Sequence, residues 1–308
     1  MFDCKPLSDS RDRVGESPVW SVAQQALYWV DIEGCLIRRF DWATQTQTQW
    51  TMPQRVGCIA LSNRNTVIAA MEDGVYEVTL AGFDGASGGA PVSTTLLAAV
   101  THGAANMRFN DGRCDASGRL WAGTMVMDMS LASTEGNLYC LDENGLSAPK
   151  QADLITPNGS AFSPDGRCMY LSDSHPSRQT IWTYDFDVQT AGLSNRRAFA
   201  DMKPLPGRPD GAAVDSEGCY WICGNDAGQV HRFSSTGALL SSVPVPVSKP
   251  AMCAFGGPEL SHLFVTSIIP GKPAEGFDAA LDGAVFVFQP GVRGLAEPLF
   301  TRFPKSVQ

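Results

Sequence analysis

Four oxygen-bearing side chains stand at comparable places in the chain, each at the start of a short segment that continues as an apolar strand. They are Glu16 in "GESPVW", Asn110 in "RFNDG", Asn158 in "PNGSAF" and Asp210 in "PDGAAV". Carboxylate and amide oxygens, without histidine or cysteine, suit hard divalent ions such as Ca²⁺, Mg²⁺ or Mn²⁺. If the fold brings these side chains together, they predict a binding site for one such ion.

Turn chemistry explains each of these residues when it is taken alone. Asn-Gly and Asp-Gly are common turn dipeptides, and Glu-Ser-Pro is ordinary in a loop. An Asx-Gly pair would normally lie between two strands, however, whereas here it precedes the first strand and a separate polar turn follows. The four residues as a set therefore favour the ion-site interpretation.

The segments that carry these residues are copies of one repeating unit. Each copy shows a short apolar strand, a polar turn of about four to six residues and a second alternating strand. The spacing of the second strands gives a repeat of roughly 40 to 53 residues, which is typical of propeller blades. These strands begin near Leu27, Val67, Leu120, Met169, Tyr220 and Leu263.

Six copies predict an all-β fold, a six-bladed propeller with four antiparallel strands per blade, formed by residues 1–308 as a single domain. We expect the late strand "GAVFVFQP" and the tail "EPLFTRF" to pair with N-terminal residues and close the ring. Trp29, Trp121 and Trp221 occupy similar places in three second strands, so we expect them to pack between blades.

The propeller explains why polar groups stand at the entry of apolar strands. The first strand of each blade lines the central channel, and its entry end faces one mouth of that channel. Counting ten or eleven residues back from each second strand gives one residue per blade at that mouth. These are Glu16, Val56, Asn110, Asn158, Asp210 and Cys253. Four oxygen carriers and two apolar residues predict a metal at the channel mouth. Asp173 could also reach this mouth, and His175 beside it is a candidate substrate contact.

Composition narrows the classes of partner. The chain has 308 residues, is 44% hydrophobic and carries a formal net charge of −9, which argues against nucleic acid or an anionic membrane as its main partner. The N-terminal segment lacks the apolar stretch of a secretory signal, and no apolar run approaches the ~18 to 20 residues of a membrane span. Nine scattered cysteines are typical of free thiols in a reducing compartment, so we expect a cytoplasmic protein. We also expect a monomer or a weak homodimer.

The motifs together resemble the SMP-30/gluconolactonase/luciferin-regenerating family of six-bladed propellers. The matching segments run from "GESPVW" through "RFNDGRCDASGRLWAGTM", "PNGSAFSPDG" and "PDGAAVDSEG" to "CAFGGPELSHLFVTS". The resemblance implies a sugar lactonase with one divalent metal held by Glu16, Asn158 and Asp210. It implies that Arg108 and Asn110 face the substrate, that Asp111 orients their loop and that Asp128 contacts substrate hydroxyls. Ca²⁺ is the expected ion, with Mg²⁺, Mn²⁺, Zn²⁺ or Fe²⁺ as alternatives.

The expected reaction is hydrolysis of an aldonolactone such as gluconolactone, galactonolactone or a pentonolactone. We find no Ser-His-Asp arrangement on a nucleophile elbow, so the general base is expected to be a carboxylate. Asp210 is the first candidate and Glu16 the second. Arg108 stays charged and can position the lactone without moving protons. The alternative is a non-catalytic propeller in which the ion fills the channel structurally and another face binds a protein.

Overall fold

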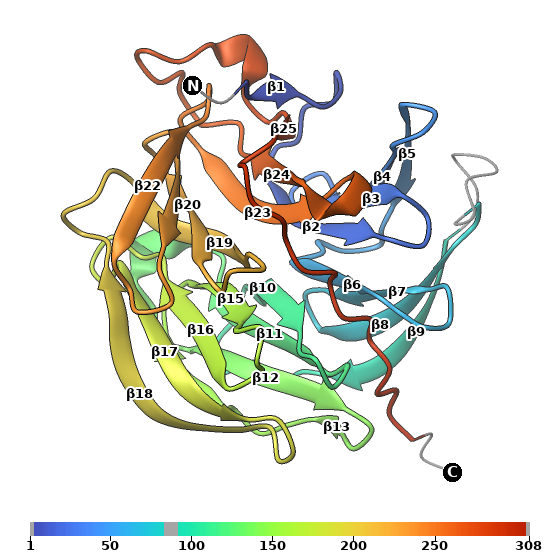
Figure 1. Cartoon of the computed structure of the whole chain (residues 1–308). Coiled ribbons are helices and arrows are strands. Elements are labelled where there is room, and N and C mark those ends of the chain that lie inside the picture. The colour runs from blue at the N-terminus through green and yellow to red at the C-terminus, as the bar shows by residue number, and fades with distance from the viewer. Residues whose placement is uncertain (1–2, 83–91, 306–308) are drawn as a thin grey trace.

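The six repeats form six separate antiparallel sheets around a central channel (Figure 1). The computed structural model describes residues 3–82 and 92–305. Blade one contains β2 (Gly15–Ser21), β3 (Ala26–Asp31), β4 (Leu36–Asp41) and β5 (Thr46–Thr51). Blade two contains β6 (Cys58–Leu61), β7 (Val67–Ala70), β8 (Gly74–Leu80) and β9 (Val92–Ala99). Blade three contains β10 (Met107–Cys114), β11 (Leu120–Val126), β12 (Gly136–Asp142), β13 (Gly145–Leu146) and β14 (Gln151–Leu154).

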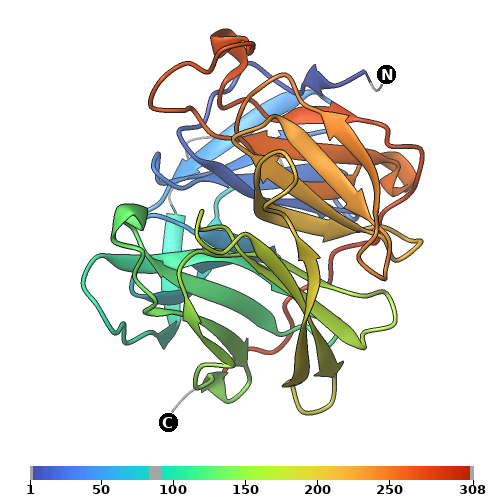
Figure 2. The same cartoon turned by 90° about the vertical axis from the view of Figure 1, so that its left-hand side faces the viewer.

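The remaining blades follow the same order from the channel outwards. Blade four contains β15 (Pro157–Phe162), β16 (Cys168–Asp173), β17 (Thr180–Asp187) and β18 (Gly192–Asp201). Blade five contains β19 (Arg208–Val214), β20 (Tyr220–Asn225), β21 (Gln229–Phe233) and β22 (Leu239–Pro244). Blade six contains β23 (Pro250–Gly256), β24 (His262–Ser267), β25 (Phe286–Phe288) and β1 (Lys5–Pro6). In the side view the blades stand around the ring as separate twisted sheets (Figure 2).

The register of the strands confirms the predicted repeat. In every blade the first residue of the predicted second strand pairs with a residue at the end of the innermost strand. The pairs are Trp20 with Leu27, Leu61 with Val67, Cys114 with Leu120, Phe162 with Met169, Val214 with Tyr220 and Phe255 with Leu263. The innermost strands β2, β6, β10, β15, β19 and β23 contact one another in ring order. The predicted six-bladed propeller is therefore confirmed.

The helical content of the described residues is small. It consists of the 3₁₀ turns η1 (Met129–Leu131), η2 (Pro258–Leu260) and η3 (Ala279–Leu281). Within residues 3–82 and 92–305, no helix has the length and apolar character needed to cross a membrane.

The ring closes in blade six, where N-terminal residues pair with the late strand in "GAVFVFQP", as predicted. The prediction that the tail "EPLFTRF" also pairs with N-terminal residues is wrong. β1 pairs with β25, placing Lys5 opposite Val287 and Pro6 opposite Phe286. The tail does not join the N-terminus, because Phe300 bonds instead to the backbone of Leu61 in blade two. Its ring is fully buried there, so apolar burial against blades two and three decides where the tail lies.

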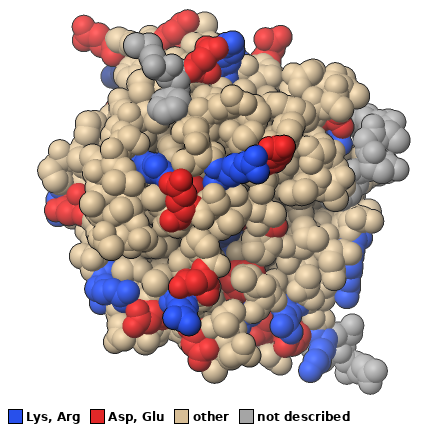
Figure 3. All heavy atoms as spheres, viewed as in Figure 1, with Lys and Arg blue, Asp and Glu red and all other residues tan. Residues whose placement is uncertain are grey.

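The C-terminal segment crosses one face of the ring, where acidic and basic side chains are interspersed (Figures 1 and 3). It contacts the turns between first and second strands, since Thr301 N donates to Gly118 O and Ser216 N donates to Arg293 O. A cavity of about 270 Å³ lies beneath it, beside the ion pair between Arg113 and Glu297. The entry ends of the innermost strands lie at the opposite face.

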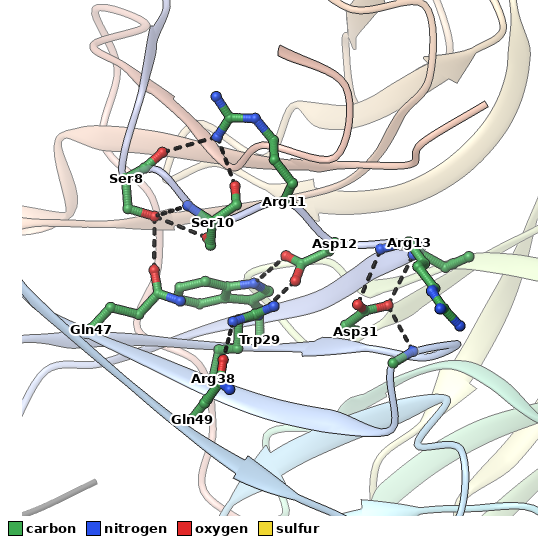
Figure 4. A network of polar contacts seen from close by, with 12 residues as sticks. Ser8, Ser10, Arg11, Asp12, Arg13, Trp29, Asp31, Arg38, Gln47 and Gln49 are labelled. Carbon is green, nitrogen blue, oxygen red and sulfur yellow. Dashed lines mark hydrogen bonds and ion pairs between the residues drawn. The ribbon is translucent and has the colours of Figure 1, made fainter. Parts of the chain in front are cut away.

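Three buried aspartates fix the tryptophans that we expected to pack between blades. The indole Nε1 groups of Trp29, Trp121 and Trp221 donate to Asp12, Asp115 and Asp215 at 2.7, 2.9 and 2.9 Å. Each aspartate also pairs with an arginine: Arg38, Arg119 and Arg232. In blade one, Asp12 accepts from Arg38 Nε at 2.6 Å while neighbouring Asp31 binds backbone N–H groups (Figure 4). Each tryptophan also lies in an apolar cluster that joins two neighbouring blades, so the predicted packing between blades is confirmed.

Asp12→Ala is expected to lower the free energy of unfolding by about 3–5 kcal/mol, because it leaves the buried guanidinium of Arg38 and the indole of Trp29 unpaired. Burial raises the pKa of Asp12 to about 6, and Arg38 opposes that rise, so the carboxylate is largely ionised at neutral pH. Urea denaturation at about pH 7.5 measures the loss. Asp185→Ala, which breaks an exposed pair with Arg197, is the control and should change stability far less. Equal losses would contradict this role for Asp12.

Candidate active site at the channel mouth

The predicted metal ligands occupy the same place in three innermost strands. Glu16, Asn158 and Asp210 each lie four residues before the strand residue that pairs with the start of the second strand. Asn110 holds that place in blade three. All four side chains are buried at the entry ends of β2, β10, β15 and β19. The structure therefore brings them to one mouth of the channel, on the face opposite the C-terminal segment.

The same register corrects the two apolar members of the predicted set. The equivalent residues are Gly57 rather than Val56 in blade two, and Ala251 rather than Cys253 in blade six. The count of ten or eleven residues did not fix the position, because Gly57 lies ten residues before Val67 while Ala251 lies twelve before Leu263. The correction leaves the chemistry unchanged, since neither glycine nor alanine offers a side-chain ligand.

A β-bulge accompanies the site in each strand that supplies a polar residue. The register shifts between Glu16 and Val19, Phe109 and Gly112, Asn158 and Ala161, and Pro209 and Ala212. A bulge inserts one extra residue and turns the side chains beside it. Gly159 follows Asn158 with φ of 64°, and a Cβ there would lie 2.4 Å from the Tyr220 hydroxyl. Glycine is therefore required next to the ligand.

A chain of hydrogen bonds joins the predicted substrate-facing residues to the predicted ligands. Arg108 Nη1 donates to Asn110 Oδ1 at 2.6 Å and to Phe109 O at 2.8 Å. Asn110 Nδ2 donates to Asn158 Oδ1 and to Pro157 O, both at 3.0 Å. Asn110 thus uses both ends of its amide inside the protein, and Arg108 is the member of this pair with donors left for a ligand.

Other hydrogen bonds hold the acidic side chains of the site. Asn225 Nδ2 donates to Asp210 Oδ2 at 2.6 Å, and Ser160 N donates to Asp111 Oδ2 at 2.7 Å. Asp111 is buried in β10, and its bond to Ser160 links this strand to β15. Residues 108–111 therefore lie in a strand rather than in the expected loop, and the orienting role of Asp111 stays a prediction. Among the described residues, Asp111 Oδ1 and Arg108 Nε are buried without a hydrogen-bond partner.

The electrostatics of the site are dominated by buried acids. Burial, followed by the neighbouring charges of Asp210 and Asp111, raises the pKa of Glu16 well above its ordinary range. Burial also raises the pKa of Asp210 to about 7, although Arg208 and the Asn225 amide oppose the rise. The pKa of Asp111 is raised by burial too, and burial lowers that of Arg108. The charges of these three buried acids therefore repel one another, and the nearby positive charges compensate only in part.

These residues fit a divalent cation. The donors are two carboxylates and one amide, all oxygen ligands, buried at the entry ends of three innermost strands. The unpaired Asp111 oxygen and the mutual repulsion of the acids are both relieved by positive charge. Histidine and cysteine take no part in this donor set.

Asp128 lies apart from this cluster. It is exposed and begins η1, accepting hydrogen bonds from the backbone N and Oγ of Ser130, and these bonds lower its pKa. β11 leads towards the mouth, since Met125 pairs with Arg108, so Asp128 follows the strand end nearest the site. Its contact with substrate hydroxyls stays a prediction.

Asp173 and His175 have local roles in the structure. Asp173 accepts from the backbone N–H groups of Ile155, Thr156 and His175 and is fully buried, so its oxygens are not directed into the channel. His175 Nδ1 shares a hydrogen bond with Ser177, and the contact of His175 with substrate stays a prediction.

Sequence reasoning missed the residues that support the ligands. Asn158 donates to Ser174, and Asn225 donates to Asp210. Arg208 donates to both Ser174 and Asn225. A signal existed, because Ser174 and Asn225 stand five residues after the aligned Met169 and Tyr220. Comparing that position across the six copies would have shown two polar residues in the blades that carry Asn158 and Asp210.

We expect divalent metal to stabilise the protein more at about pH 8 than at about pH 5.5. Because the folded-state pKa of Asp210 is raised to about 7, its contribution to stability is complete below about pH 4 and is lost as the pH rises towards 7. Metal then binds the charged form without competition from protons. Thermal unfolding with and without Ca²⁺ at both pH values measures this, with Asp210→Asn as the control. A Tm increase that is equal at both pH values would contradict the placement of the ion beside Asp210.

Comparison with known proteins places the chain in a family. Residues 14–269 match the family described as "SMP-30/Gluconolactonase/LRE-like region". The chain is 37% identical to the 6-deoxy-6-sulfogluconolactonase of Pseudomonas putida over 93% of this chain and 94% of that protein. It matches the structure of a luciferin-regenerating enzyme with a TM-score of 0.89 and 28% identity, covering 98% of this chain and 100% of that one.

A second solved structure is a calcium-binding protein, regucalcin, from Agrobacterium tumefaciens. The TM-score is 0.85 at 26% identity, with 97% of this chain and 98% of that chain covered. These matches extend over almost the entire propeller rather than over a single blade. The chain therefore belongs to the SMP-30/gluconolactonase/LRE-like family, as its motifs predicted.

Proposed function

We propose that this protein hydrolyses a sugar lactone to the aldonic acid, using one divalent ion held by Glu16, Asn158 and Asp210. The observation that carries the proposal is the convergence of these three buried oxygen ligands beside Arg108, a cation with unpaired donor capacity. The lactonase among the relatives supports a lactone as substrate. The calcium-binding neighbour supports Ca²⁺ as the ion.

The ion would supply polarisation of the lactone carbonyl and a lowered pKa for water at the site. Asp210 takes the proton from the attacking water and returns it to the ring oxygen as the ester C–O bond breaks, which opens the lactone to the aldonic acid. Asp210 is held for this role by the Asn225 amide, which donates to its Oδ2. Glu16 is the alternative base. Arg108 donates to the lactone oxygens and stabilises the charge that develops on them.

The substrate is a small sugar lactone that fits the channel mouth. Arg208 and Lys249 share the carboxylate of Asp226 on the blade that carries Asp210, so one positive charge is left without a partner in this trio. A lactone with an anionic substituent therefore belongs in a substrate panel beside gluconolactone, galactonolactone and a pentonolactone, and the sulfogluconolactonase relative supports the same choice.

A pH-indicator assay of this panel tests the proposal. The protein is first stripped of metal with a chelator and then supplied with Ca²⁺, Mg²⁺, Mn²⁺, Zn²⁺ or Fe²⁺. We expect hydrolysis to disappear on chelation and to return with metal. Metal binding without hydrolysis of any lactone would favour the second candidate, a non-catalytic calcium-binding propeller, for which the regucalcin structure is the supporting observation.

A further inference from the structure

The two ends of the Asn158 amide differ chemically, and only the oxygen can bind a cation. Asn158 is 3% exposed, so hydrogen bonds within the protein rather than solvent determine which end of its amide faces the channel. A similar choice exists at Asp210, whose two oxygens can face either the channel or the blade. Residues behind these two ligands must therefore fix their orientation.

Ser174 fixes the orientation of the Asn158 amide. Its hydroxyl donates its single proton to Pro209 O, so towards Asn158 it can only accept. Asn158 Nδ2 fills that position, donating to Ser174 Oγ at 2.6 Å. The Asn158 oxygen is thereby turned away from Ser174, where it accepts from Asn110 and keeps a second lone pair.

Asn225 fixes the orientation of the Asp210 carboxylate. Its Nδ2 donates to Asp210 Oδ2 at 2.6 Å, and its own oxygen faces Arg208 Nη2 at 3.4 Å. The amide therefore presents a donor to the carboxylate and leaves Asp210 Oδ1 as the oxygen without this bond. The polarity is opposite to that of Ser174, which accepts, because an amide ligand needs an acceptor behind it and a carboxylate needs a donor.

Ser174 and Asn225 hold the same place in their blades. Each stands five residues after the start of its second strand, at Met169 and at Tyr220. The other blades have Ile32, Glu72, Met125 and Ile268 at this place. An uncharged hydrogen-bonding side chain thus occurs there in the two blades that carry Asn158 and Asp210.

Arg208 ties the two supports together. Its Nη1 donates to Ser174 O at 3.1 Å, its Nη2 faces Asn225 Oδ1, and its Nε pairs with Asp226 at 2.5 Å. The guanidinium thereby bridges blades four and five behind both ligands.

We propose that Ser174 and Asn225 are positioning residues that select which oxygens of Asn158 and Asp210 face the channel axis, and so set the metal affinity of the site. This inference rests on the proposed function. Supporting hydrogen bonds of this kind typically change metal affinity by about 10- to 100-fold when they are removed.

The first test is the affinity for Mn²⁺ of metal-free Ser174→Ala, measured by calorimetry. We expect binding about 10- to 100-fold weaker than in the wild-type protein. Ser267→Ala is the matched control, because Ser267 is equally buried at the corresponding end of β24 and donates to Ala284 O at 2.6 Å, in a blade without a ligand. It should lower Tm to a similar extent and leave Mn²⁺ affinity unchanged.

A double-mutant cycle separates orientation from general stability. In an Asn158→Asp background both ends of the side chain are oxygens, so an oxygen faces the channel whichever way the side chain is turned, and Ser174 no longer determines which kind of atom does. Ser174→Ala should then cost much less Mn²⁺ affinity than it does beside Asn158. A merely structural serine would cost the same in both backgrounds. Asn225→Leu, which removes the donor to Asp210 at similar volume, should weaken Mn²⁺ binding to a degree comparable with Ser174→Ala.

The outcomes distinguish this inference from the proposed function. If the wild-type protein binds Mn²⁺ and hydrolyses lactones while Ser174→Ala and Asn225→Leu bind like Ser267→Ala, the positioning role is wrong and the lactonase proposal stands. If the effect of Ser174→Ala is equal in the wild-type and Asn158→Asp backgrounds, selection of the amide oxygen is wrong. If the wild-type protein binds no Mn²⁺, the metal site and this inference are both wrong.

Discussion

Asp210→Asn is expected to lower kcat by about 10²- to 10⁴-fold, even when metal is saturating, because the substitution keeps an oxygen ligand but removes the base. A carboxylate can accept the proton of the attacking water and release it again, whereas an amide cannot. Steady-state hydrolysis of the best lactone measures kcat, and calorimetry measures metal occupancy of the same sample.

Glu16→Gln is the comparison variant for this prediction. If Asp210 is the base, Glu16→Gln should weaken metal binding but retain more of kcat once metal is saturating. Turnover of Asp210→Asn near the wild-type value at full occupancy would remove Asp210 as the base and assign that role to Glu16, the second buried acid with a raised pKa.

Arg108→Ala is expected to lower kcat/KM by about 10- to 100-fold, the loss that corresponds to a charged hydrogen bond of about 1.5–3 kcal/mol. Metal affinity should not fall, because the guanidinium does not bond directly to a predicted ligand and its positive charge beside Glu16 opposes that of the ion. The lactone would be poorly placed while the metal remained. Lactone kinetics and calorimetry together measure this separation.

Arg113→Ala is the matched control, because Arg113 is a buried arginine on the same strand that faces the opposite mouth. It should reduce stability but leave kcat/KM intact at temperatures where the protein is folded. If Arg108→Ala behaves like this control, the predicted substrate contact of Arg108 is wrong. Wild-type turnover in both Arg108→Ala and Asp210→Asn would mean that the channel mouth is not the active site.

The repeat pattern predicted the fold because each blade repeats the same strand–turn–strand chemistry. The six second-strand positions, from Leu27 to Leu263, all pair as a blade requires. Glu16, Asn110, Asn158 and Asp210 could be predicted as neighbours because the residue at the entry of each first strand must face the channel. The path of the C-terminal tail could not, because Phe300 is held by tertiary burial that no local pattern encodes.

The supporting residues of the site were harder to predict than the ligands. Ser174 and Asn225 are ordinary polar residues at strand ends, and their meaning comes from bonds to Asn158 and Asp210 in the folded ring. The orientation of the Asp128 side chain could not be predicted either, because its hydrogen bonds to Ser130 form in the short turn that follows β11.

A crystal structure of the protein soaked with Mn²⁺, with anomalous data collected for manganese, tests the central claim most directly. We predict one anomalous peak at the channel mouth, bound by oxygens of Glu16, Asn158 and Asp210 at about 2.0–2.6 Å. A peak held by histidine or cysteine, a peak elsewhere in the ring or the absence of any peak would contradict the account.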